Sequence, residues 1–155
     1  MQGLHLTADL YQCRCESAWL TDASQLSDWC GKAVEAVGLH AVNQVFQALP
    51  AGGVTATVLL AESHVCLHTW PGERSVTIDV YVCNFGDDNS AKARGLMYAL
   101  VNRFQPDVLH LAGVDPHWLE ANQPASSHPT GTPPLRTSNG NSRAPCALPR
   151  RAYPD

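Results

Sequence analysis

The chain has 155 residues and a formal net charge of −4, a length typical of one small domain. Residues 1–112 carry 6 basic and 11 acidic side chains, so no basic surface can neutralise phosphates, and nucleic-acid binding is excluded as a main role. The first residues lack a signal-peptide pattern, and no apolar run approaches a membrane span. We therefore expect a cytoplasmic protein that binds neither nucleic acid nor membrane.

Composition changes near residue 112. Eight of the eleven prolines lie in residues 113–155, together with many Ser, Thr and Asn residues. A polar, proline-rich segment buries too little apolar surface to offset the entropy lost on ordering. We expect one folded domain at residues 1–112 and a disordered tail at residues 113–155.

The first half of the domain predicts one helix among strands. Residues 4–11 alternate like a strand, and capping side chains around Asp22 precede a helical apolar pattern that ends at Gly38. Residues 39–49 and 54–61 then indicate two strands joined by a short proline- and glycine-containing loop. A β-hairpin is the expected result.

The second half continues this pattern. Residues 64–69 and 76–83 predict a further strand pair, a helix follows Asn89 and ends before Pro106, and residues 108–111 predict a last strand. Short links favour a mostly antiparallel sheet, and two amphipathic helices cover only one of its faces. The expected fold is an α+β two-layer sandwich whose uncovered face is buried in a dimer.

Six cysteines are present in the chain. Without an export signal, we interpret them as thiols rather than disulfides. Cys13, Cys15 and Cys30 lie in or beside apolar segments, where cysteine commonly serves as a small hydrophobic residue. We therefore expect a structural role for these three.

The reactive residue types gather between residues 62 and 83. Glu62-Ser63 supplies a hydroxyl, His68 a candidate base and Cys83 a thiol. In an antiparallel strand pair the spacing allows His68 and Cys83 to approach Ser63. The same stretch also permits a metal-binding module, since His64, Cys66 and His68 share one strand face.

Three motifs carry a resemblance to a known family. Ala61-Glu62-Ser63-His64, His68-Thr69-Trp70-Pro71 and Asp79-Val80-Tyr81-Val82-Cys83 resemble the prokaryotic S-adenosylmethionine decarboxylase proenzymes, over roughly residues 4–111. The resemblance implies a pyruvoyl-dependent enzyme of spermidine biosynthesis that cleaves itself between Glu62 and Ser63. It implies a β chain of residues 1–62 and an α chain that starts at Ser63.

The resemblance also implies roles for three side chains. Ser63 would attack the carbonyl of Glu62 to form an ester, and β-elimination would leave a dehydroalanine. Its hydrolysis, with loss of ammonia, would give a pyruvoyl group as the only cofactor, without pyridoxal phosphate or metal. That ketone would form a Schiff base with the substrate amine and accept the electrons released with carbon dioxide. His68 would carry protons during processing and Cys83 would return a proton to the substrate. The mature enzyme would be a dimer of αβ units.

Substrate recognition is where the chain departs from the family. Family members usually follow Trp-Pro with Glu, whereas this chain has Gly72 and then Glu73, and Leu49 replaces a frequent Phe. Trp70 remains as an aromatic surface, and Thr55 keeps a hydroxyl where Ser is common. We predict substrate contacts at Leu49, Thr55, Trp70 and Glu73. A pyruvoyl-dependent arginine or ornithine decarboxylase is the first alternative, and a non-catalytic metal-binding or regulatory module is the second.

Overall fold

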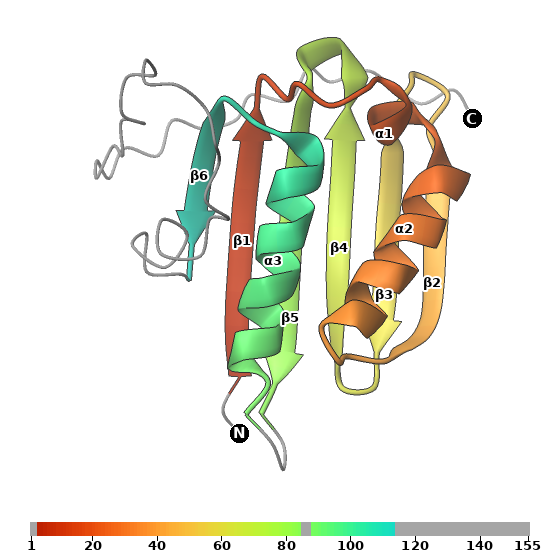
Figure 1. Cartoon of the computed structure of the whole chain (residues 1–155). Helices are drawn as coiled ribbons and strands as arrows, with labels where there is room; N and C mark the ends of the chain where they lie inside the picture. Colours follow the sequence, from red (N-terminus) through yellow and green to blue (C-terminus); the bar gives the residue numbers. More distant parts are fainter. Residues whose placement is uncertain (1–2, 85–87, 114–155) are drawn as a thin grey trace, which may run out of the picture.

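The computed structural model describes residues 3–84 and 88–113, and the tail predicted at residues 113–155 lies almost entirely outside the described residues. Six strands form one sheet in the order β2-β3-β4-β5-β1-β6, and every neighbouring pair is antiparallel. Helices cover one face of this sheet (Figure 1). The predicted α+β two-layer sandwich is confirmed.

The boundaries follow the sequence pattern closely. The strands are β1 (Gly3–Tyr11), β2 (Ala41–Ala48), β3 (Val54–Leu60), β4 (Ser63–Trp70), β5 (Ser75–Cys83) and β6 (Val108–Ala112). The helices are α1 (Ala18–Thr21), α2 (Ala23–Ala36) and α3 (Ser90–Phe104), and a 3₁₀ turn, η1, spans Pro71–Glu73. The short helix α1 and the 3₁₀ turn are additions to the predicted elements.

The two long helices begin and end as their sequences suggest. The side chain of Asp22 caps α2 by accepting a hydrogen bond from the backbone N–H of Gln25 at 3.0 Å. At α3, Asn89 occupies the cap position, but Asp88 supplies the capping carboxylate to the N–H of Ser90 at 2.9 Å. Gln105 ends α3 in the left-handed conformation, with a φ of 50°.

Alternation along the strands separates a core face from an open face. Leu6, Leu67, Ile78 and Val80 are buried against the helices, together with Phe104 of α3. Helix α2 packs over β2 and β3, and α3 packs over β1 and β5. Among the described residues, no helix is long and apolar enough to cross a lipid bilayer.

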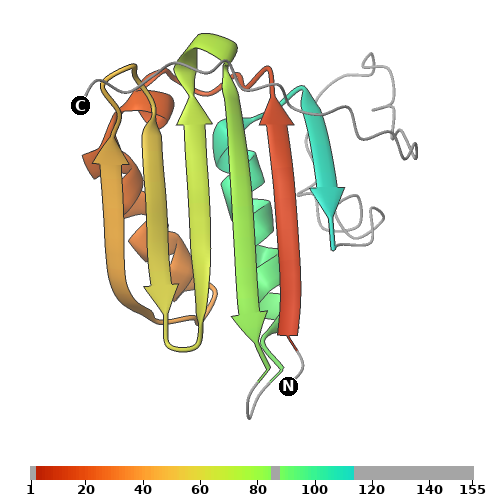
Figure 2. The same cartoon turned by 180° about the vertical axis from the view of Figure 1, so that it is seen from behind.

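The opposite face of the sheet carries no helix, as Figure 2 shows from behind. Its side chains include His68 and Asp79 near the centre, and the exposed apolar side chains of Val45 and Leu59 toward one edge. We call this surface the open face.

The predicted structural cysteines lie in the core. Cys13, Cys15 and Cys30 are buried, and all five cysteines among the described residues are free thiols. Burial raises the pKa of Cys30 to about 12, and burial together with the neighbouring Cys15 raises the pKa of Cys13 to about 11. Both thiols therefore stay protonated and unreactive near neutral pH.

Candidate active site

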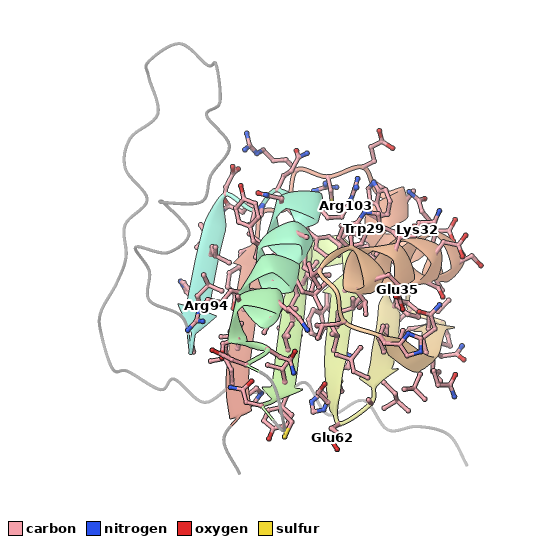
Figure 3. The ribbon with its side chains drawn as sticks, turned by 60° about the horizontal axis from the view of Figure 1, so that its bottom comes forward. Trp29, Lys32, Glu35, Glu62, Arg94 and Arg103 are labelled. Atoms are coloured by element: carbon pink, nitrogen blue, oxygen red, sulfur yellow. The ribbon has the colours of Figure 1, made fainter. Side chains whose placement is uncertain are left out.

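The Glu62–Ser63 bond lies in a tight hairpin at one end of the sheet. Leu60 pairs with Ser63, so Ala61 and Glu62 alone form the loop between β3 and β4. Glu62 lies at the outer tip of this hairpin (Figure 3), whereas Ser63 is half-buried as the first residue of β4. The peptide bond that the sequence singles out is thus held in a defined turn between two central strands.

Cys83 lies at the same end of the sheet. His64 pairs with Tyr81, so the last residue of β5 falls opposite the hairpin. Cys83 is only 8% exposed, and its carbonyl accepts a hydrogen bond from Nδ2 of Asn89 at 3.1 Å. We call this end of the sheet, which holds Glu62, Ser63 and Cys83, the hairpin end.

His68 does not share this position. It pairs with Thr55 on β3 and with Thr77 on β5, and five residues of extended strand separate it from Ser63, which is roughly 16 Å. Odd spacing also places the two side chains on opposite faces of the strand. The expectation that His68 approaches Ser63 within one chain is therefore wrong.

The residues predicted to bind substrate gather at the other end of the sheet. Trp70 ends β4, Glu73 lies in the 3₁₀ turn that follows, and Leu49 lies in the loop between β2 and β3. A side chain at Gly53 would place its Cβ 2.2 Å from the carbonyl oxygen of Thr69, which shows how closely this loop packs against β4. We call this end of the sheet, which holds Leu49, Trp70 and Glu73, the turn end.

His68 and Thr55 lie close to the turn end. Oγ1 of Thr55 and Nδ1 of His68 are 3.1 Å apart, within hydrogen-bond distance. The rings of His68 and Trp70 lie 6.0 Å apart between centroids, tilted by 35°. The structure thus brings five of the predicted residues near one end, and Ser63 and Cys83 near the other.

A hollow of about 240 Å³ opens on the open face between β1, β4 and β5. Its lining consists of Thr7, Asp9, Cys66, His68, Thr77, Ile78 and Asp79. Two carboxylates and an imidazole therefore share one concave surface, in the middle of the face that no helix covers.

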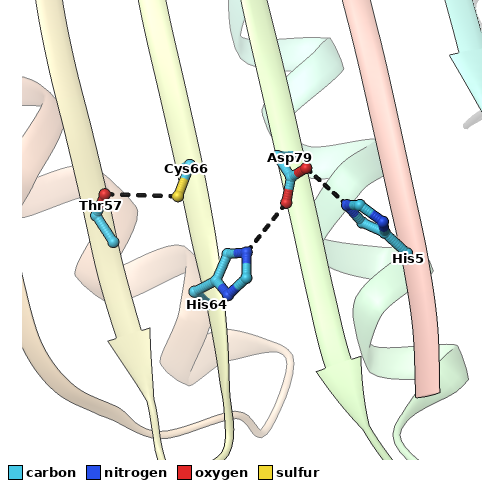
Figure 4. A network of polar contacts seen from close by, with 5 residues as sticks. All are labelled: His5, Thr57, His64, Cys66 and Asp79. Carbon is cyan, nitrogen blue, oxygen red and sulfur yellow. Dashed lines mark hydrogen bonds and ion pairs between the residues drawn. The ribbon is translucent and has the colours of Figure 1, made fainter. Parts of the chain in front are cut away.

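Sequence reasoning missed a polar network beside this hollow. Asp79 joins two histidines from the flanking strands, with Oδ2 at 2.6 Å from Nε2 of His5 and Oδ1 at 3.3 Å from Nε2 of His64 (Figure 4). The ring of Tyr81 lies beside both imidazoles. His5 and Asp79 are 74 positions apart, so only the register of β1 against β5 reveals the contact.

The metal-binding alternative finds no ligand set. Sγ of Cys66 lies 3.5 Å from Oγ1 of Thr57, within the contact distance of a weak hydrogen bond (Figure 4). In the described parts of the chain, no three His, Cys, Asp or Glu side chains are close enough to hold a metal ion. His64, Cys66 and His68 share a strand face without converging.

Comparisons with known proteins agree with the resemblance drawn from the motifs. A model of the S-adenosylmethionine decarboxylase family matches residues 4–115. An S-adenosylmethionine decarboxylase proenzyme of Hydrogenobaculum is 34% identical over 105 residues, which cover 67% of this chain and 73% of that protein. A proenzyme of the same name from Aquifex aeolicus is 35% identical, over 57% of this chain and 63% of that protein.

The fold agrees as well. The crystal structure of the adenosylmethionine decarboxylase from Aquifex aeolicus superposes with a TM-score of 0.62 at 29% sequence identity, over 71% of this chain and 86% of that one. The family match covers both ends of the sheet, from β1 to β6. This chain belongs to the S-adenosylmethionine decarboxylase family.

Proposed function

We propose that this chain is a proenzyme that cleaves itself between Glu62 and Ser63 and then decarboxylates S-adenosylmethionine, supplying the aminopropyl donor for spermidine. The observation that carries the proposal is the Glu62–Ser63 bond in a two-residue hairpin with Cys83 at the same end, in a member of this family.

Processing needs a nucleophile held beside a peptide carbonyl. Ser63 begins a strand whose ladder fixes the backbone on its C-terminal side, while the two-residue loop leaves the carbonyl of Glu62 outside any ladder. In the proposed reaction Oγ of Ser63 attacks that carbonyl, and the chain divides into residues 1–62 and residues 63–155. His68 is the proposed proton carrier, because an imidazole takes up and releases protons near neutral pH.

The separation of Ser63 from His68 supports a reaction centre shared by two copies. In such a dimer two copies stack through their open faces, and the two-fold axis lies between the sheets, perpendicular to the strands. The rotation places the hairpin end of one copy over the turn end of the other. Cys83 of one copy, which shares the open face with Asp79, would then meet His68, Thr55 and Trp70 of its partner, and the Glu62–Ser63 bond would lie at the edge of the same contact. The uncovered sheet face, with exposed Val45 and Leu59, supports such stacking.

The pyruvoyl group fits this position, because Ser63 is half-buried at a chain turn and becomes a new N-terminus on cleavage. When formed, it supplies a ketone that takes up the electrons released with carbon dioxide. Cys83 holds the proton that we propose is returned to the substrate. Trp70 offers an aromatic surface, 41% exposed, for the adenine ring, and Glu73 offers a carboxylate for the ribose hydroxyls.

The relatives' names favour S-adenosylmethionine over arginine or ornithine, because each relative described above is named for adenosylmethionine. Two departures at the turn end, Leu49 and the Gly72-Glu73 order, touch recognition and leave the hairpin end unchanged. The substrate therefore requires its own assay, separate from the assay of processing.

Intact-mass measurement and a decarboxylation assay test the proposal together. We expect the purified chain to divide after residue 62 and the Ser63→Ala variant to stay whole. Release of labelled carbon dioxide is then compared for S-adenosylmethionine, arginine and ornithine. An intact wild-type chain after prolonged incubation contradicts the pyruvoyl mechanism, and turnover of arginine or ornithine alone contradicts the substrate.

A further inference from the structure

Arg74 has an unusual backbone conformation directly after the 3₁₀ turn. Its φ is 46° and its ψ is 47°, in the left-handed region where a side chain crowds the following carbonyl and glycine is the ordinary choice. An arginine at such a position needs compensating contacts. The structure supplies them through its guanidinium group.

The guanidinium of Arg74 binds the backbone of a distant segment. Nε donates to the carbonyl oxygen of Cys13 at 2.6 Å, and Nη2 donates to the carbonyl oxygen of Cys15. The backbone completes the link, since the N–H of Cys13 donates to the carbonyl of Arg74 at 2.9 Å. We call residues 12–15, which follow β1, the strap.

The strap is itself anchored to the body of the domain. The N–H of Arg14 donates to the carbonyl of Gln105 at 3.0 Å, and the N–H of Cys15 donates to that of Phe104 at 3.3 Å. The side chains of Cys13 and Cys15 are buried in the core. Arg74 thus connects the 3₁₀ turn, through the strap, to the C-terminal end of α3.

The 3₁₀ turn has little else to hold it on its outer side. Gly72 and Glu73 are exposed, and a Cβ at Gly72 would meet nothing within 4 Å. The hydrogen bond inside the turn, from the N–H of Arg74 to the carbonyl of Pro71, is 3.2 Å long. The hydrogen bonds of the neighbouring Arg74 guanidinium therefore add a second constraint on the position of Glu73, beside the hydrogen bond inside the turn.

We propose that Arg74 is a positioning residue for substrate binding: its guanidinium clamps the 3₁₀ turn to the strap and so holds Glu73 and Trp70 in place for the adenosyl group. This inference rests on the proposed function, because it assigns those two residues to substrate. Arg74 itself touches backbone oxygens of the strap and has no chemical role in the reaction. Its loss acts on binding, before any bond is broken.

Arg74→Gly tests the clamp without disturbing the backbone, because glycine adopts the left-handed conformation freely. We expect the variant to cleave at Ser63 as the wild type does, because Ser63 and His68 both belong to the paired strand β4 and not to the 3₁₀ turn that Arg74 clamps. The KM for S-adenosylmethionine should rise about tenfold or more, as two hydrogen bonds from a charged donor are lost. The kcat should stay within about twofold, and Arg74→Lys should restore part of the KM.

Gln105→Gly is the matched control. Gln105 is also left-handed, with a φ of 50°, and its hydrogen bond with the strap uses its backbone carbonyl, which glycine retains. The control should leave the KM unchanged. A KM for Arg74→Gly equal to that of the wild type overturns the proposal, as does an equal rise in Gln105→Gly.

Thiol alkylation gives a second measurement that needs no activity. With the clamp lost, iodoacetamide should label Cys13 and Cys15 faster, as located by mass spectrometry, while the labelling of Cys30, on the buried face of α2, should not change. Unchanged labelling of Cys13 and Cys15 overturns the clamp. If the wild type does not turn over S-adenosylmethionine, the proposed function fails, and the labelling still decides whether Arg74 holds the strap.

Discussion

His68 on β4 and Cys83 on β5 face the same side of the sheet but lie near its opposite ends. Thr77 is the residue paired with His68, and six further residues of β5 lead from there to Cys83, or roughly 20 Å. One copy of the chain therefore does not bring the two side chains to a single reaction centre. If both act in the same reaction, they come from different copies.

Complementation between two inactive variants checks this arrangement. Ser63→Ala and His68→Ala should each remain uncleaved when expressed alone. Co-expressed under two different tags, they should form mixed dimers in which the His68→Ala chain is cleaved, because its Glu62–Ser63 bond lies at the end of the sheet that meets His68 of the other chain. Intact mass after tandem affinity purification gives the result. Cleavage of His68→Ala alone, or no cleavage in the mixture, contradicts a shared reaction centre.

Cys83→Ala separates processing from turnover. We expect normal cleavage, because the variant retains Ser63 and His68, and a loss of decarboxylation of about a hundredfold or more, the usual effect of removing a positioned acid. Carbon dioxide release per cleaved chain is the measurement. Cys66→Ala, which removes a half-buried thiol on the same open face, should keep its activity. Full turnover by Cys83→Ala would remove Cys83 as the proton donor.

Gly72→Glu restores a carboxylate directly after Trp-Pro. The structure has room for the side chain, since a Cβ there meets nothing within 4 Å. We expect the KM for S-adenosylmethionine to fall by about threefold to tenfold, the gain from one charge-assisted hydrogen bond. Gly72→Gln has the same shape without the charge and should gain less. Equal KM values in all three proteins would show that Glu73 already meets the need.

Gly53 and Gly52 provide a stability test within one loop. Both have positive φ, of 92° and 87°, but only a Cβ at Gly53 would meet backbone, at 2.2 Å from the carbonyl oxygen of Thr69. Gly52→Ala should lower the free energy of unfolding by about 1 kcal/mol, and Gly53→Ala by at least about 3 kcal/mol, since a steric clash is added. Urea unfolding compares the two. Similar losses would contradict the close packing of the loop on β4.

Alkaline pH should destabilise the fold through its buried thiols. The pKa of Cys30 rises from 9.0 to about 12 and that of Cys13 to about 11, chiefly through burial. The unfolded chain releases these protons near pH 9 while the folded chain keeps them, so stability is full below pH 9 and falls as the pH rises toward 12. Unfolding of wild type and Cys30→Ala from pH 7 to 10.5 should show a shallower fall in the variant. If the free energy of unfolding falls equally with pH in both proteins, Cys30 is not a source of the alkaline destabilisation.

Local sequence pattern was enough to predict the six strands and the two long helices. Capping at Asp22, helical spacing through Cys30 and short loops between strands fix elements that depend on neighbouring residues. The predicted strand 39–49 is shorter in the structure, Ala41–Ala48, and is irregular between Ala41 and Asn43. Edge strands are least constrained by pairing, which explains the difference.

The pairing of strands that are far apart in the chain could not be predicted from local sequence pattern. The insertion of β1 between β5 and β6 depends on contacts between residues 66 or more positions apart, such as Leu10 and Val76. The His5–Asp79 pair and the anchoring of the strap depend on the same insertion. The five-residue spacing of Ser63 and His68 did contain a usable signal, because an odd interval on a strand reverses the face. The sequence contains no comparable signal for the contacts of Arg74, because its hydrogen-bond partners are backbone carbonyl oxygens, which every residue has.

The sheet order gives the proposed cleavage a lasting consequence. Residues before the Glu62–Ser63 bond form β1, β2 and β3, whereas those after it form β4, β5 and β6, and in the order β2-β3-β4-β5-β1-β6 the two products interleave. Neither product holds a complete sheet, so they stay joined without a peptide bond. Once unfolded, however, the mature enzyme must reassemble from separate chains, and its recovery becomes dependent on concentration. Only the uncleaved precursor can fold as a single chain, at a rate that does not depend on protein concentration.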